Sequence, residues 1–186
     1  MTLNNLVGND IRALRKSRGA TIKELSATLG RSVGWLSQVE RGQATPSITD
    51  IAAIANNFGV NISFFFRSAN RDPDEQGIVL RAADRIPIGS SESGLIEELL
   101  SPTLGGTFEM IKSTFAPRSS SDGLRAARQS EDGGVLISGQ LTLEIDDLTL
   151  ALEAGDSFQF TSRTYSWRNN HDTPAVAVWV ISPPVY

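Results

Sequence analysis

Residues 31–42 read Arg-Ser-Val-Gly-Trp-Leu-Ser-Gln-Val-Glu-Arg-Gly, and this stretch decides the fold of the first third of the chain. Leu36 and Val39 stand three positions apart, so both face inward on one side of a helix. Ser32 suits the N-cap, and Gly42 stands where a left-handed C-cap residue belongs. The outward side chains are short hydrogen-bonding groups and an arginine, which suit a helix that enters a DNA groove about 12 Å wide. An ordinary amphipathic helix with a solvated face is the alternative, so the neighbouring sequence has to decide.

The neighbouring sequence predicts an all-α domain of five helices. They are expected over residues 5–17, 21–29, the opening stretch, 47–58 and 61–66. Thr21 with Glu24, and Ser47 with Asp50, have the spacing of capping boxes, in which two residues three apart satisfy each other's helix-start amides. The second and third helices, joined by a glycine-containing turn, form the pattern of a helix-turn-helix.

Charge is divided unevenly along the 186-residue chain, whose net charge is −4. Residues 1–70 hold eight Lys and Arg against four Asp and Glu, which gives +4. Residues 71–186 hold nine Lys and Arg against seventeen Asp and Glu, which gives −8. Because an acidic surface repels phosphates, any DNA contact is expected before residue 70, and the division favours two domains with different partners.

Several motifs of the basic region resemble the Cro/C1-type (XRE-family) helix-turn-helix domain. The resemblance covers about residues 9–66 and rests on Thr21-x-x-Glu24-Leu25-Ser26-x-x-Leu29-Gly30, Leu36-Ser37-Gln38-Val39-Glu40-Arg41-Gly42 and Pro46-Ser47. It implies a sequence-specific DNA-binding transcriptional regulator. It also implies that Arg15 and Glu40 form a partly buried ion pair with a structural role.

The resemblance assigns base reading to Val33, Gly34, Ser37 and Gln38. The Gln38 amide can pair with adenine, and Val33 can touch a thymine methyl. Gly34 costs about 1 kcal/mol of helix propensity relative to alanine, which either a close approach to DNA or a turn-like helix start would explain. The Trp35 indole N–H either reaches a phosphate or packs on the second helix, and the DNA-facing role is the favoured interpretation.

Phosphate contacts are expected at the start of the second helix and beyond the third, because helix N-termini bind anions. The predicted DNA-binding residues are Thr21, Lys23, Ser32, Val33, Gly34, Trp35, Ser37, Gln38, Arg41 and Thr45.

The remainder of the chain predicts an all-β domain. Residues 67–77 carry five charges and a proline and are interpreted as a linker, so the expected division is 1–66, 67–77 and 78–186. From Ile78 the hydrophobic period changes from 3.6 to 2, which favours an antiparallel sandwich or barrel. Strands are expected over residues 78–81, 97–100, 107–115, 134–138, 141–146, 148–152, 157–160 and 176–181, with a hairpin at Asp146-Asp147.

Three motifs in this region resemble the cupin (jelly-roll) barrel, namely Leu136 to Leu143, Leu152 to Phe158 and Trp179 to Pro184. Metal-binding cupins place three histidines and a glutamate in the barrel, at positions that here fall near Ala126, Arg128, Asp132 and Ser166. One carboxylate does not hold a transition metal, and the sole histidine, His171, is expected in a loop. The prediction is therefore no metal, no cofactor, no catalytic set and no enzyme.

With a metal site and an enzyme set aside, the sequence leaves a barrel that could bind a small-molecule effector. The predicted effector pocket consists of Arg125, Arg128, Asp132, Gln159, Tyr165, Ser166, Trp167 and Trp179. An arginine there could hold an anionic effector through bidentate hydrogen bonds. The alternative is that these side chains fill the interior and the barrel serves only for dimerisation.

Composition completes the prediction of a two-domain α+β cytoplasmic protein. Cysteine is absent, which fits a reducing compartment, and no run of about 18 apolar residues could span a membrane. Two copies are expected to bind a near-palindromic double-stranded operator as a homodimer. A cupin enzyme with an atypical site and an antitoxin-like partner-binding protein are the alternatives.

Overall fold

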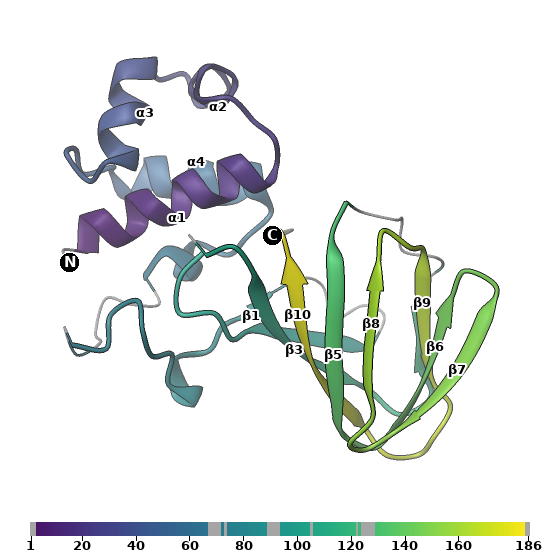
Figure 1. Cartoon of the computed structure of the whole chain (residues 1–186). Coiled ribbons are helices and arrows are strands. Elements are labelled where there is room, and N and C mark those ends of the chain that lie inside the picture. The colour runs from purple at the N-terminus through teal and green to yellow at the C-terminus, as the bar shows by residue number, and fades with distance from the viewer. Residues whose placement is uncertain are drawn as a thin grey trace. The chain divides into compact units, whose positions relative to one another are not determined.

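The computed structural model describes residues 3–66, 72, 74–88, 94–104, 106–121, 123 and 129–184. The chain forms two compact units (Figure 1). One comprises Met1–Ile86 with Ser101–Gly106, and the other comprises Pro87–Leu100 with Thr107–Pro184. The sequence did not predict that residues 101–106 belong with the helical unit, where Leu104 is buried and its amide donates to Asp10 Oδ1 at 3.4 Å.

The first unit is helical. Its α-helices are α1 (Leu3–Ser17), α2 (Ile22–Thr28), α3 (Val33–Glu40) and α4 (Ile48–Phe58). The expected fifth helix is a 3-10 turn, η1 (Ile62–Phe66), so the described part of this unit holds four α-helices and not five. A short 3-10 turn, η2 (Ala82–Asp84), follows. The core gathers one apolar face from each element, including Ile11, Leu14, Leu25, Leu36, Val39, Ile54, Phe58, Phe64 and Phe65.

Side chains fix where the helices begin. Thr21 and Glu24 form the predicted capping box on α2, and Ser47 and Asp50 form the one on α4. Ser32 caps α3 by accepting from the Trp35 amide at 3.1 Å. These three predictions are confirmed.

Close packing of α1 on α3 depends on Gly8. A Cβ built on this residue would lie 2.2 Å from the carbonyl oxygen of Val39. Only glycine lets the two backbones approach to this distance, and the hydrophobic pattern gave no sign of it.

The second unit contains two antiparallel sheets. The larger has the strand order β1 (Pro87–Ile88), β2 (Leu95–Leu99), β3 (Glu109–Phe115), β10 (Ala175–Ser182), β5 (Glu131–Ser138) and β8 (Ser157–Thr161). The smaller has the order β4 (Ser119–Ser120), β9 (Tyr165–Asn169), β6 (Gln140–Ile145) and β7 (Leu148–Glu153). In Figure 1 β7 ends one side of the smaller sheet.

Most strands lie where the alternating pattern predicts them. The hairpin is confirmed, since Ile145 pairs with Leu148 across Asp146, which adopts φ 51°. The expected strand at residues 78–81 is wrong, because Ile78 ends a turn and η2 follows. Strands β1, β4 and β9 were missed.

Alternation along the strands creates an inner and an outer face. On β6, Leu141, Leu143 and Ile145 are buried, while Thr142 and Glu144 between them are partly exposed. On β10, Ala175, Ala177, Trp179 and Ile181 are buried in the same way. Successive side chains of a strand point to opposite faces, so the register of each pair decides which residues line the interior.

Candidate nucleic-acid interface

The outward face of α3 carries the predicted base-reading residues. Gln38 and Gly34 are exposed, Val33 is 44% exposed and Ser37 is partly buried. A Cβ built on Gly34 would meet no atom within 4 Å, so this glycine is not required by packing inside the protein. The face therefore offers a small apolar group, an amide and a hydroxyl on one short helix, which are kinds of group that can contact base edges.

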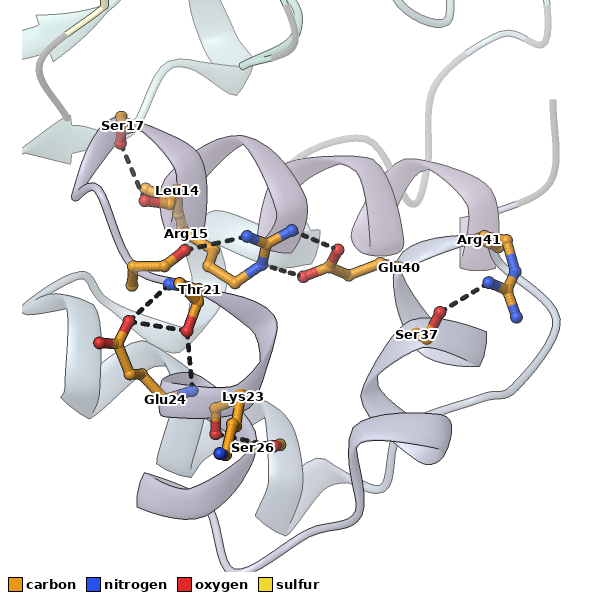
Figure 2. A network of polar contacts seen from close by, with 11 residues as sticks. Leu14, Arg15, Ser17, Thr21, Lys23, Glu24, Ser26, Ser37, Glu40 and Arg41 are labelled. Atoms are coloured by element: carbon orange, nitrogen blue, oxygen red, sulfur yellow. Dashed lines mark hydrogen bonds and ion pairs between the residues drawn. The ribbon is translucent and has the colours of Figure 1, made fainter.

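Arg41, the C-cap residue of α3, folds back along this face. Its Nη1 donates to Ser37 Oγ at 2.6 Å (Figure 2). Its Nε donates to Gln43 Oε1 at 3.0 Å. The arginine is exposed at the end of the helix.

The predicted phosphate anchors lie at helix ends. Thr21 and Lys23 are exposed at the start of α2. The amide of Thr21 already donates to Glu24 Oε2 at 2.7 Å, so this amide is not available for a phosphate. Hydrogen bonds from the Thr21 backbone and hydroxyl lower the pKa of Glu24. Thr45 beyond α3 is exposed, and its Oγ1 accepts from Asn4 Nδ2 at 2.6 Å.

A buried ion pair joins α3 to α1. Arg15 Nε and Nη2 donate to Glu40 Oε1 and Oε2 at 2.6 and 2.9 Å, and Arg15 Nη1 donates to the Ala20 carbonyl at 2.9 Å (Figure 2). The two side chains are 12% and 5% exposed. The hydrogen bond to Glu40 raises the pKa of Arg15. The predicted structural pair is confirmed, and it fixes the C-terminal end of α3.

Arg31 was not predicted as a functional residue. Its Nη2 and Nε lie 2.7 and 2.9 Å from Asp50 Oδ1, and its Cζ lies 5.2 Å from the centroid of the Trp35 ring. The helical spacing rule does not indicate the ring contact, because Arg31 precedes the N-cap Ser32 and lies outside α3. The pairing with Asp50 could not be found from the sequence, because the two residues are nineteen positions apart.

In the barrel, four of the predicted pocket residues lie inside. Asp132, Trp167 and Trp179 are buried, and Tyr165 is partly buried. Ser130 Oγ donates to Asp132 Oδ2 at 2.9 Å. The indole nitrogens of both tryptophans are buried and have no hydrogen-bond partner among the described residues.

Two predicted pocket residues lie on the outer faces, so the prediction is wrong for them. Gln159 is exposed between the inward Phe158 and Phe160, and its amide bonds to Glu131. Ser166 Oγ donates to Glu144 Oε2 at 2.6 Å on the outer face of the smaller sheet. The other two, Arg125 and Arg128, lie outside the described residues.

Aromatic rings pack against one another inside the barrel. Phe158 lies 4.5 Å from Trp179 between ring centroids, and Tyr165 lies 5.3 Å from Phe160 and 5.6 Å from Trp179. Phe115 and Trp167 form a second contact at 4.8 Å. The Phe158–Trp179 and Phe115–Trp167 contacts are edge-to-face, and the two contacts of Tyr165 are tilted. Ring contacts of this kind stabilise a core. They agree with the alternative in which side chains fill much of the interior.

Within the described ranges no three His, Cys, Asp or Glu side chains are grouped as a metal site would need. His171 is exposed, and its amide donates to Asn169 Oδ1 at 3.1 Å. No helix in the described part is both long and apolar enough to cross a bilayer.

Comparison with known proteins agrees with both halves of the fold. Family models described as "Helix-turn-helix domain" and "Cupin domain" match residues 6–62 and 112–181. The HTH-type transcriptional regulator PuuR of Escherichia coli is 26% identical over 152 residues, which cover 81% of this chain and 80% of PuuR. The transcriptional regulator ClgR of Mycobacterium tuberculosis is 30% identical over 95 residues, which cover 51% of this chain and 82% of ClgR.

Among solved structures, hydroxypropylphosphonic acid epoxidase from S. wedmorenis is similar with a TM-score of 0.50 and 13% identity, covering 96% of this chain and 97% of the epoxidase. This likeness concerns the fold alone. The two family matches and the regulators show that the chain belongs to the XRE-type (Cro/C1-type) helix-turn-helix transcriptional regulators with a C-terminal cupin domain.

Proposed function

We propose that this chain is a sequence-specific DNA-binding transcriptional regulator that acts in the cytoplasm as a homodimer. The observation that carries the proposal is the exposed outer face of α3, where Val33, Gly34 and Gln38 stand free of the core that buries Leu36 and Val39.

Gln38 is the main base reader in this proposal, because its amide can give and accept a hydrogen bond with adenine. Val33 supplies an apolar contact, and Ser37 becomes available when Arg41 moves to a phosphate. Ser32, Trp35, Lys23 and Thr45 fix the register on the DNA backbone without reading sequence, as phosphate contacts do.

The cupin unit joins two copies and takes a small-molecule effector without a metal ion. Two α3 helices then lie about one DNA turn apart, roughly 34 Å, on a near-palindromic operator. Ligand control requires that the effector bind the DNA-competent and DNA-incompetent dimers with different affinity. Asp132 and Tyr165 on the inner faces of β5 and β9 support an effector site at the barrel.

The test begins with selection of the preferred duplex from random DNA by the full-length protein. Gln38→Ala should then weaken binding to the selected duplex by about 1–3 kcal/mol and leave binding to random DNA nearly unchanged. An equal loss on both kinds of DNA would assign Gln38 to the fold or to phosphate contact. Failure to enrich any duplex would remove the proposal.

We infer further that the barrel is not a catalytic site, which the named role of PuuR supports. Elemental analysis of the purified protein tests this: a near-stoichiometric transition metal would favour an enzyme. Co-purification of a tight protein partner would favour an antitoxin-like role.

A further inference from the structure

The helix α3 is held at both ends by an arginine that bonds a carboxylate. At its C-terminal end, Glu40 pairs with Arg15 of α1. At its N-terminal end, Arg31 reaches past Trp35, in the first turn of α3, to Asp50 in the first turn of α4. The Arg31–Asp50 contact is more exposed than the Arg15–Glu40 contact.

Three helices meet at Arg31. Its backbone amide donates to the Ser26 carbonyl at 2.9 Å and so terminates α2. Its guanidinium lies over the Trp35 ring on α3 and bonds Asp50 on α4. A guanidinium suits this position because its plane stacks on an aromatic face while its edge donates hydrogen bonds.

Asp50 uses its two oxygens for two tasks. Oδ2 accepts from the Ser47 amide at 3.0 Å and from the Ser47 hydroxyl at 2.7 Å, which completes the cap of α4. Oδ1 accepts from Arg31. Burial acts to raise the pKa of Asp50, but the hydrogen bonds from Ser47 and Arg31 outweigh burial and lower it. The carboxylate is therefore ionised at neutral pH and keeps the arginine in place.

We propose that Arg31 is a positioning residue for DNA recognition: its bond to Asp50 and its stacking on Trp35 set the angle at which α3 presents Gln38 and Val33 to the major groove. The inference rests on the proposed function. It assigns Arg31 a role different from that of a phosphate anchor, because its charge is already matched by Asp50 within the protein.

Salt dependence separates the two roles. Arg31→Ala should weaken operator binding about tenfold at a fixed salt concentration. The slope of log K against log salt concentration should stay unchanged, because no phosphate contact is lost. A phosphate anchor would instead reduce the slope by about 0.9, and that result would overturn the proposal. Arg12→Ala, which removes an exposed charge from α1, is the control for general electrostatics.

Asp50→Asn gives an opposite-sign test. Removing a negative charge from a DNA-binding unit ordinarily strengthens DNA binding. Positioning predicts the reverse: binding weakens about as much as with Arg31→Ala, and the double variant is no weaker than either single variant. Ser47→Ala weakens the cap of α4 but keeps the Arg31–Asp50 bond, so it should leave operator affinity unchanged. Stronger operator binding by Asp50→Asn, or equal losses with Ser47→Ala, would contradict the proposal.

Two further measurements do not depend on the operator affinity of Arg31→Ala. Arg31→Lys keeps the charge but lacks the planar guanidinium, so positioning predicts that lysine does not restore binding, whereas a phosphate anchor would be largely preserved. Acrylamide quenching reports the ring contact without DNA, because Trp35 is partly exposed while Trp167 and Trp179 are 1% and 5% exposed. Arg31→Ala should raise the acrylamide quenching of Trp35. Unchanged quenching would mean that Arg31 does not cover the Trp35 ring. Quenching is independent of operator binding, so failure of the proposed function and failure of this inference give different results.

Discussion

Gly8 and Gly34 both lie within α-helices, yet an alanine at each would meet different surroundings. At Gly34 the new methyl group points into open space, so Gly34→Ala should stabilise the helical unit by about 1 kcal/mol. At Gly8 it would collide with the Val39 carbonyl, so Gly8→Ala should destabilise the unit by about 1–3 kcal/mol. Urea unfolding followed by the circular dichroism signal of the α-helices measures both changes. A Gly8 variant as stable as the parent protein would mean that α1 and α3 do not approach so closely.

Two bidentate arginine–carboxylate pairs differ mainly in burial. The Arg15–Glu40 pair is 12% and 5% exposed, and the Arg118–Asp172 pair is 64% and 82% exposed. Because removing one partner leaves a buried charge unpaired, Glu40→Ala should cost about 3–5 kcal/mol of unfolding free energy. Asp172→Ala should cost less than about 1 kcal/mol, since water already solvates both groups. If thermal or urea unfolding gave equal losses of unfolding free energy for Glu40→Ala and Asp172→Ala, burial would not explain the contribution of the Arg15–Glu40 pair.

At the scale of elements, the capping boxes predict how stability depends on pH. In the folded protein, hydrogen bonds from Thr21 lower the pKa of Glu24. Burial acts to raise the pKa of Asp50, but the hydrogen bonds from Ser47 and Arg31 outweigh burial and lower this pKa as well. Folding is then favoured while both are ionised. The stability is present above their ordinary pKa values and is lost as pH falls through the lowered ones.

The helical unit should therefore lose stability as pH falls from about 5 toward 3. Asp50→Asn should show a shallower decline over the same interval, because one of the two responsible groups no longer titrates. Urea midpoints measured at several pH values test this, and Ser17→Ala on α1, which leaves both capping carboxylates in place, is the control. A decline as steep in Asp50→Asn as in the parent protein would assign the pH dependence to other groups.

Signals between residues close in the sequence predicted most helices and strands. Contacts between residues far apart in the sequence could not be predicted. Capping boxes at Thr21 and Ser47 and the turn at Asp146 depend on residues within three positions of each other, so their chemistry can be read directly. Strand β9 was missed because Tyr165 and Trp167 are its two aromatic residues on the inward positions, and the next inward residue, Asn169, is polar although it is fully buried. The two-residue strands β1 and β4 are too short to show any period.

The candidate site divides in the same way. The exposed face of α3 was predictable from helical spacing, and the Arg15–Glu40 pair from resemblance. The inner and outer faces of β8 and β9 depend on register, so Gln159 and Ser166 were placed wrongly in the interior. Arg31 with Asp50 joins segments nineteen positions apart, which only the fold brings together.

For the whole molecule, the proposed dimer predicts a geometric requirement on the operator. Two half-sites should lie about 10 base pairs apart between centres, so that both α3 helices face the same side of the duplex. Inserting five base pairs between them should reduce affinity to that of a single half-site, because the second half-site then faces the opposite side. Titration of both duplexes, with a scrambled second half-site as control, measures the effect. Equal affinity for the parent and lengthened duplexes would mean that the two copies bind independently.

The length of α3 limits how much genetic information one copy can read. Eight residues, Val33–Glu40, extend about 12 Å along the helix axis, which matches only about three to four base pairs of a duplex that rises about 3.4 Å per pair. A sequence of about three to four base pairs recurs throughout any chromosome. Against roughly a million or more competing sites it cannot specify one promoter. The operator must then be specified jointly by the half-sites that two copies read and by the distance between those half-sites. The part of the protein that sets the spacing of the two copies therefore contributes to selectivity without contacting a base.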